Sequence, residues 1–137
     1  MLRLTLTIAA LAALLLAACG APSTADAPLF PGATAQSAGK NTMADALAGS
    51  FAMHIGKQLN DPAIALYAVP AETKWAEVKG FYAERLTAEG WQEEPALLVE
   101  GDTFSYAGWK KDGATLALGL VENMIGDGAY MTLASYR

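Results

Sequence analysis

Residues 73–91, TKWAEVKGFYAERLTAEGW, carry the clearest local pattern in this 137-residue chain. Five large apolar side chains recur there at helical spacing: Trp75, Val78, Phe81, Tyr82 and Leu86. This stripe predicts an amphipathic helix over Thr73–Glu89. Gly90 suits the left-handed position that follows many helices, and Trp91 then falls where it can contact Leu86, as in a Schellman motif.

After this helix the apolar period changes from 3.6 residues to 2, which is typical of strands. The alternation predicts three strands: Thr103–Lys110, Ala114–Glu122 and Ala129–Tyr136. The tripeptide Lys111-Asp112-Gly113 is a tight-turn signal between the first two strands, and a longer loop over residues 123–128 joins the last two. Strands that follow one another through short loops form an antiparallel meander.

Two further elements are predicted before the helix. Apolar residues at four-residue intervals, among them Phe51 and Ile55, predict a helix over Thr42–Leu59. Ala63–Val69 reads as a strand that joins the same sheet. We therefore expect an α+β fold, a small two-layer sandwich in which the 73–89 helix covers a three- to four-stranded, mainly antiparallel sheet.

The first eighteen residues have the form of a secretory signal peptide. Arg3 is the only charged residue before Asp26, and a nearly unbroken apolar run follows it over residues 4–16. Small residues close the run, as they do before a signal cleavage site. The run is shorter than the roughly 20 residues that a membrane-spanning helix requires.

The end of this leader, Leu16-Ala17-Ala18-Cys19, resembles the lipobox of bacterial lipoproteins. The resemblance implies cleavage before Cys19, thioether lipidation of its sulfur and acylation of the new N-terminus. Two alternatives are an ordinary signal peptide with an accidental cysteine and a buried apolar helix. The resemblance places the protein in the bacterial cell envelope, anchored on the outer side of the cytoplasmic membrane or on the outer membrane. Gly20, rather than Asp, follows the cysteine, which by the same resemblance permits outer-membrane sorting if the cell has an outer membrane.

The chain then divides into a tether and one domain. Residues 1–18 are the expected signal peptide, and residues 19–28 form a lipidated tether without large apolar side chains. Residues 29–137 form a single α+β domain that starts at the apolar cluster over residues 29–33.

Three short motifs of this domain also resemble a loose group of small bacterial envelope lipoproteins. They are Pro31-Gly32-Ala33 near the domain start, Phe81-Tyr82 in the helix and Gly90-Trp91 at its end. The resemblance implies a helix followed by a β-meander. It implies no particular activity.

Composition excludes several functions. The chain has 9 Lys and Arg against 14 Asp and Glu, with a pI near 4.7, so it has no electrostatic footprint for a nucleic-acid partner. One cysteine forms no intramolecular disulfide, and with one histidine it forms no Cys/His zinc cluster. We expect no metal and no cofactor.

Catalytic constellations are also poorly supported. His54 is the only imidazole and lies on a predicted helix. With Met53 and Met43 it could suggest a copper site, but the adjacent Met53 points about 100° away from it on a helix. Met43 is more typical of a core residue than of a copper ligand. Glu93-Glu94 and the pair Glu100 and Asp102 read as solvated acids rather than as a glycosidase pair. Gly126-Asp127-Gly128 lacks the alternating ligands of a calcium loop. We therefore expect no enzymatic activity.

The remaining candidates are apolar residues at expected surfaces. By alternation Trp109 faces away from Phe104 and Tyr106 and is expected to be exposed, and Met124-Ile125 is an apolar pair in a predicted loop. We hypothesise that Trp109 or Met124 and Ile125 contact a protein partner or the membrane interface.

These observations favour a non-enzymatic binding, accessory or scaffold module of the envelope that contacts a protein partner. The sheet face opposite the 73–89 helix, or an edge strand, is the expected contact surface. The alternative is a small apolar-ligand or lipid carrier, with a pocket between helix and sheet lined by Trp75, Phe81 and Tyr82.

Overall fold

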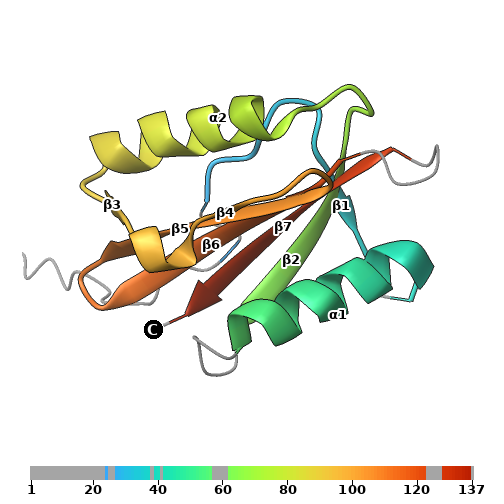
Figure 1. The fold of residues 1–137 in the computed structure, drawn as a ribbon, viewed down its shortest axis with the longest axis horizontal. Coiled ribbons are helices and arrows are strands. Elements are labelled where there is room, and N and C mark those ends of the chain that lie inside the picture. Colours follow the sequence, from blue (N-terminus) through green and yellow to red (C-terminus); the bar gives the residue numbers. More distant parts are fainter. Residues whose placement is uncertain are drawn as a thin grey trace, which may run out of the picture.

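The computed structural model describes residues 24, 27–37, 39–40, 42–56, 62–122 and 128–136. In these ranges an antiparallel sheet carries one helix on each face (Figure 1). The helices are α1 (Thr42–Gly56) and α2 (Trp75–Ala88). The strands are β1 (Thr34–Gln36), β2 (Ala63–Val69), β3 (Gln92–Glu93), β4 (Val99–Glu100), β5 (Phe104–Lys111), β6 (Ala114–Val121) and β7 (Ala129–Tyr136).

Helix α2 confirms the sequence prediction to within two residues at each end. The N–H of Trp91 donates to the carbonyl of Leu86 at 2.9 Å, and the N–H of Gly90 donates to the carbonyl of Thr87 at 3.0 Å. Gly90 has a φ of +88°, which is the left-handed conformation that glycine adopts without strain. These two bonds define the Schellman motif expected from the sequence.

The predicted meander is also confirmed. Strands β5, β6 and β7 pair in sequence, and Asp112 and Gly113 form a two-residue turn with φ values of 49° and 78°. Positive φ at both positions is the type I′ geometry that matches strand twist. Strand β2 joins this sheet, as expected, between β7 and β1.

The sheet is larger than the sequence analysis predicted, and the expectation of three to four strands was wrong. It has 7 strands, in the order β1-β2-β7-β6-β5-β3, with β4 also paired to β5. The additional strands β1, β3 and β4 have three, two and two residues. Segments this short do not develop a readable alternation, so the sequence pattern did not reveal them.

Helix α1 adds a layer that the two-layer sandwich did not include. Its Phe51 and Ile55 are buried against Tyr106, Ala117 and Ala134, on the sheet face opposite α2. Gly119 of β6 makes room for this helix, because a Cβ there would lie 2.7 Å from Phe51 Cε2 and 2.6 Å from Thr132 Oγ1. The two sheet faces are therefore covered by different helices.

We predict that Gly119→Ala lowers the free energy of unfolding by about 1–3 kcal/mol, because the added methyl displaces the Phe51 ring or the Thr132 hydroxyl. Gly80→Ala is the matched control, since nothing lies within 4 Å of a Cβ at that helical position. It should raise stability by about 0.5–1 kcal/mol. Urea unfolding followed by circular dichroism measures both, and equal effects of the two substitutions would contradict the packing described for Phe51.

Candidate functional site

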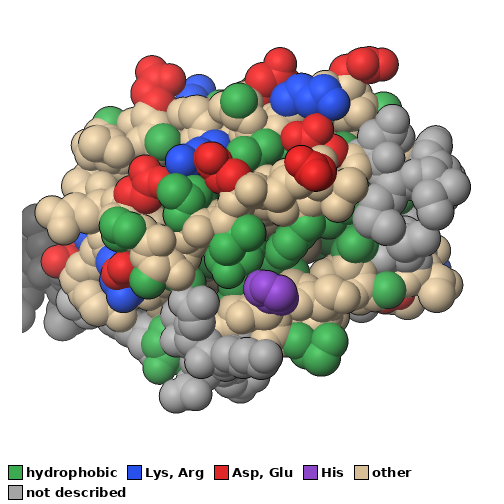
Figure 2. Space-filling view, viewed as in Figure 1, with side chains coloured by type: hydrophobic (Ala, Val, Ile, Leu, Met, Phe, Trp, Pro, Cys, Tyr) green, Lys and Arg blue, Asp and Glu red, His purple; other side chains and the backbone are tan. Residues whose placement is uncertain are grey.

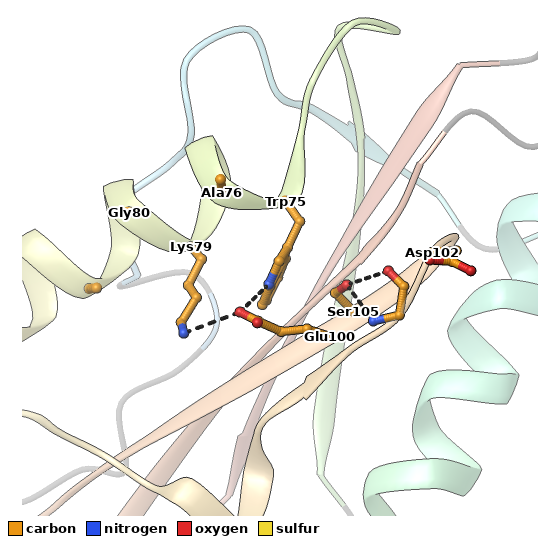
Figure 3. Close-up of a pocket in the computed structure, with 9 residues that line it drawn as sticks. Trp75, Ala76, Lys79, Gly80, Glu100, Asp102 and Ser105 are labelled. Atoms are coloured by element: carbon orange, nitrogen blue, oxygen red, sulfur yellow. Dashed lines mark hydrogen bonds and ion pairs between the residues drawn. The ribbon is translucent and has the colours of Figure 1, made fainter.

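A groove lies between the first half of α2 and the corner that joins β4 to β5 (Figure 3). Its volume is about 520 Å³, within the size range of sites for small ligands. Nine residues line it: Trp75, Ala76, Lys79, Gly80, Ala83, Glu100, Gly101, Asp102 and Ser105. Other hollows lie beside the β5–β6 turn and between α1 and β2, but this groove combines an indole, an ammonium group and two carboxylates.

Small residues on α2 create the open space. Ala76, Gly80 and Ala83 follow one another at intervals of four and three residues, so they lie along one face of the helix. Trp75 and Lys79 flank this row. The helix therefore presents an indole and an ammonium group beside a shallow row of small side chains.

A polar network connects α2 to the strands across the groove. The indole N–H of Trp75 donates to Glu100 Oε1 at 3.2 Å, and Lys79 Nζ lies 3.5 Å from the same oxygen. Lys79 Nζ also pairs with Glu93 Oε1 at 3.2 Å. The Glu100 carboxylate is thus oriented by two donors, although its side chain remains 57% exposed.

The loop that holds Asp102 is closed by a reciprocal contact. The N–H of Gly101 donates to Ser105 Oγ at 3.2 Å, and the Ser105 hydroxyl donates to the Gly101 carbonyl at 3.3 Å (Figure 3). Asp102 lies between these residues and is exposed. Among the residues described, nothing forms an ion pair with its carboxylate.

Glu122 fixes the N-terminus of α2 beside the groove. Its Oε1 accepts the backbone N–H of Trp75 at 2.9 Å, and its Oε2 pairs with Lys74 Nζ at 3.1 Å. A carboxylate at this end satisfies a free helix N–H and interacts favourably with the helix dipole. The Trp75 hydrogen bond, followed by the Lys74 contact, lowers the pKa of Glu122 below its usual value.

The structure corrects the position of Trp109. This side chain is fully buried in the core beneath α2, with no exposed area. The alternation correctly placed it opposite Phe104 and Tyr106, but α2 covers the Trp109 face, whereas Phe104 and Tyr106 lie on the α1 face. The expected exposure of Trp109, on which the hypothesis of a partner contact at this residue was based, is therefore wrong.

Several other candidates fall outside the described ranges. Cys19, Met124 and Ile125 lie there, as do Gly126 and Asp127. The hypotheses of lipidation and of partner contact at those positions therefore stay predictions.

His54 and the acidic pairs are dispersed rather than convergent. The exposed His54 ring packs edge-on against Phe104 and Tyr106, at centroid distances of 6.1 and 5.7 Å. Glu93 pairs with Lys79, whereas Glu94 pairs with Lys110 at 2.6 Å, so both adjacent acids are engaged separately. Within the described ranges, no cluster of three or more His, Cys, Asp or Glu side chains is arranged to hold a metal ion.

The carrier pocket expected from Trp75, Phe81 and Tyr82 is not formed by these three residues together. Trp75 lines the groove, whereas Phe81 packs against Phe30 at a centroid distance of 5.4 Å. Tyr82 is fully buried, and burial raises the pKa of its hydroxyl. The sequence analysis missed Lys79 and the row of small residues, although their spacing on α2 was readable.

The sheet surfaces expected to bind a partner are also restricted. Helix α1 occupies part of the face opposite α2, where Phe51 and Ile55 are buried (Figure 1). The edge strands are short: β1 has three residues, and β3 and β4 have two each. Short edges offer few free backbone groups to an added strand.

No protein-family model, curated protein or solved structure matches this chain. In the part that the structure describes, neither helix is long and apolar enough to cross a membrane.

We predict that Glu122→Gln lowers the free energy of unfolding by about 1 kcal/mol at pH 7, because the charged cap of α2 is lost. The folded-state pKa of Glu122 is depressed, so its contribution is present above the ordinary value of 4.5 and is lost as the pH falls through the folded pKa. The difference between wild type and variant should therefore shrink at acidic pH in urea titrations.

Glu84→Gln is the matched control for this substitution, because Glu84 is an exposed residue of the same helix. It should change stability by less than about 0.5 kcal/mol. A pH-independent difference between Glu122→Gln and wild type would contradict the proposed role of the ionised carboxylate.

Proposed function

We propose that this chain is a lipid-anchored protein of the bacterial cell envelope whose domain, residues 29–137, acts as a non-enzymatic binding or accessory module for a protein partner. The observation that carries the proposal is the lipobox-like Leu16-Ala17-Ala18-Cys19 at the end of an apolar leader. A chance match to this tetrapeptide seldom follows both a positive charge and an apolar run, so its position in the chain makes the signal specific.

The physical basis for anchoring is the burial of acyl chains. Each buried CH₂ contributes about 0.8 kcal/mol, and one chain alone gives reversible binding. The resemblance to lipoproteins implies two or three chains on residue 19, which give stable attachment. Cleavage also removes Arg3 and so increases the acidic excess, which disfavours adhesion of the domain itself to anionic headgroups.

The tether sets the distance between the domain and the lipid. Residues 20–28 contain Gly, Ala, Pro, Ser, Thr and Asp and no large apolar side chain. A Gly/Ser-type linker of nine residues would reach about 15–18 Å root-mean-square, and Ala27, near the end of this segment, packs against the core beneath α2, so the free part would be shorter. The domain would therefore stay just above the headgroups and remain free to meet a neighbouring envelope protein.

The groove beside α2 supports a binding role for the domain. It is open to solvent and combines an oriented carboxylate with an aromatic wall. His54, the only imidazole of the chain, does not line the groove; its ring packs edge-on against Phe104 and Tyr106.

A carrier of small apolar ligands is the second candidate, favoured by the groove volume of about 520 Å³. Its charged lining counts against this alternative, because an apolar ligand would leave Glu100 and Lys79 poorly solvated. Extraction of the purified protein with organic solvent, followed by mass spectrometry, would detect a co-purified lipid if the carrier alternative holds.

We predict that Cys19→Ser abolishes acylation and moves the protein from the membrane fraction to the soluble or unprocessed pool. Ser23→Ala, in the tether, is the control and should leave the protein on the membrane. Intact-mass spectrometry of membrane-extracted protein measures both effects. Recovery of wild-type protein with residues 1–18 attached and without fatty acid on Cys19 would overturn the anchor and the location derived from it.

The binding role needs a separate test. Crosslinking in intact cells, followed by purification of the lipidated protein and mass spectrometry, should recover one envelope protein in stoichiometric amount. Recovery of the partner should depend on the folded domain. The partner should therefore not be recovered with the destabilised Gly119→Ala variant at a temperature at which this variant is unfolded. Absence of any reproducible protein adduct from cells would contradict the accessory role.

A further inference from the structure

We propose that the groove beside α2 receives a basic side chain, Lys or Arg, from the protein partner. The inference rests on the proposed function only in taking the ligand to be part of a protein. The chemistry of the ligand itself is derived from the charge of the groove, its shape and its unoccupied hydrogen-bond acceptors.

Charge comes first. Among the described residues, Lys79 is the one cation that lines the groove, and it is already shared between Glu93 and Glu100. Asp102 is the second carboxylate of the lining and has no ion pair in the described part of the chain. One ammonium group, which is also paired with Glu93 outside the lining, faces two carboxylates in the groove, so the site is negative. The whole chain is acidic as well, with a formal charge of −5, so its field attracts cations and repels anions.

The carboxylates also have free acceptor positions. Both donors to Glu100, the Trp75 indole N–H and the Lys79 ammonium group, approach Oε1. They hold the carboxylate in place, and Figure 3 shows both contacts at one oxygen of Glu100, which leaves Oε2 without a hydrogen bond from the described residues. A carboxylate accepts several hydrogen bonds, so an incoming ammonium or guanidinium group would find an oriented acceptor there and a second one at Asp102.

The shape of the groove suits an aliphatic stem with a charged end. The row formed by Ala76, Gly80 and Ala83 gives a shallow apolar path along α2. Lys and Arg bury their methylene stems along such surfaces while the charged head reaches polar groups. Trp75 is 9% exposed, and its indole N–H points to the groove and holds the Glu100 carboxylate. An apolar ligand would match the path and not the charges, and an anion would match neither.

The neighbourhood of the groove favours a protein over a free amine. Four large apolar side chains are exposed in the described part, and two of them, Leu98 and Val99, immediately precede Glu100. Figure 2 shows hydrophobic side chains interspersed with Asp, Glu, Lys and Arg side chains on this face of the molecule. A partner protein can cover such mixed surface around an inserted basic side chain, whereas a small amine cannot.

The test uses the three tryptophan indole N–H signals in ¹H–¹⁵N correlation spectra of the detergent-solubilised, full-length mature protein. The Trp75 signal is assigned with Trp75→Phe. The probe is the acetylated and amidated peptide Ala-Leu-Arg-Ala-Lys-Ala, and the matched peptide carries Gln in place of Arg and Lys. We expect the basic peptide to shift the Trp75 signal saturably, while the signal of buried Trp109 stays fixed and the Gln peptide has no effect.

Variants then locate the binding. The double substitution Glu100→Gln with Asp102→Asn should weaken binding of the basic peptide about fivefold or more, as expected for the loss of ion pairs at a partly exposed site. Glu84→Gln removes one acidic charge elsewhere on α2 and should leave the affinity unchanged. An unshifted Trp109 signal in each variant verifies that the fold is retained. Added salt should weaken the interaction, because the groups are solvent-accessible.

Four results would overturn the inference: no saturable shift of the Trp75 signal, equal shifts with the Gln peptide, an equal loss of affinity in Glu84→Gln, or tighter binding of free spermidine than of the peptide. The last result would assign the groove to a small amine instead. The two proposals can fail separately. If one of these four results is obtained while Cys19 is acylated and a crosslinked partner is recovered, the groove inference fails and the proposed function is retained. If Cys19 is not acylated, the proposed function fails and the inference about the groove is unaffected.

Discussion

The central strand β6 has no exposed residue at any of its eight positions, and this constraint organises the rest of the fold. A strand buried on both faces needs a covering layer on each side, because apolar groups on either face would otherwise remain in water. The two faces differ in size. Leu116, Leu118 and Leu120 fill the α2 side, whereas Ala117 and Gly119 leave space on the other. The space over Ala117 and Gly119 is filled from α1, whose Phe51 ring packs there.

The position of α2 is fixed at both ends by contacts with the ends of the central strands. Glu122, immediately after β6, accepts the backbone N–H of Trp75 at the start of the helix. Lys111, at the end of β5, donates to the carbonyl of Glu89 at the other end. The helix therefore lies along the sheet with its first turns facing the β4–β5 corner (Figure 1). The groove is a consequence of this placement, since small residues on α2 occur where the corner approaches.

Sequence periodicity was sufficient for the elements that carry long, regular patterns. Helix α2, its Schellman end and the β5–β6–β7 meander all follow from apolar spacing and from Gly90, Asp112 and Gly113. Periodicity specifies which residues share a face, but it does not specify what covers that face. Trp109 illustrates the limit: its separation from Phe104 and Tyr106 was predicted correctly, and its exposure was not, because α1 was not assigned to a face. The groove depends on contacts across the fold, such as the one between Lys79 and Glu100, which are 21 positions apart and which no local pattern connects.

The distribution of free backbone groups indicates how this domain would recognise a partner. Strand addition requires a run of unpaired N–H and C=O groups along an edge. The outer strands β1, β3 and β4 are too short to provide one, and such short edges also resist aggregation. In the binding role that we propose, recognition would then depend on side chains, and oriented side chains surround the groove. Since Trp75 and Lys79 hold Glu100 before any ligand arrives, little ordering entropy would remain to be lost there on binding. The same contacts that attach α2 to the β4–β5 corner would thus prepare the acceptor for an incoming cation.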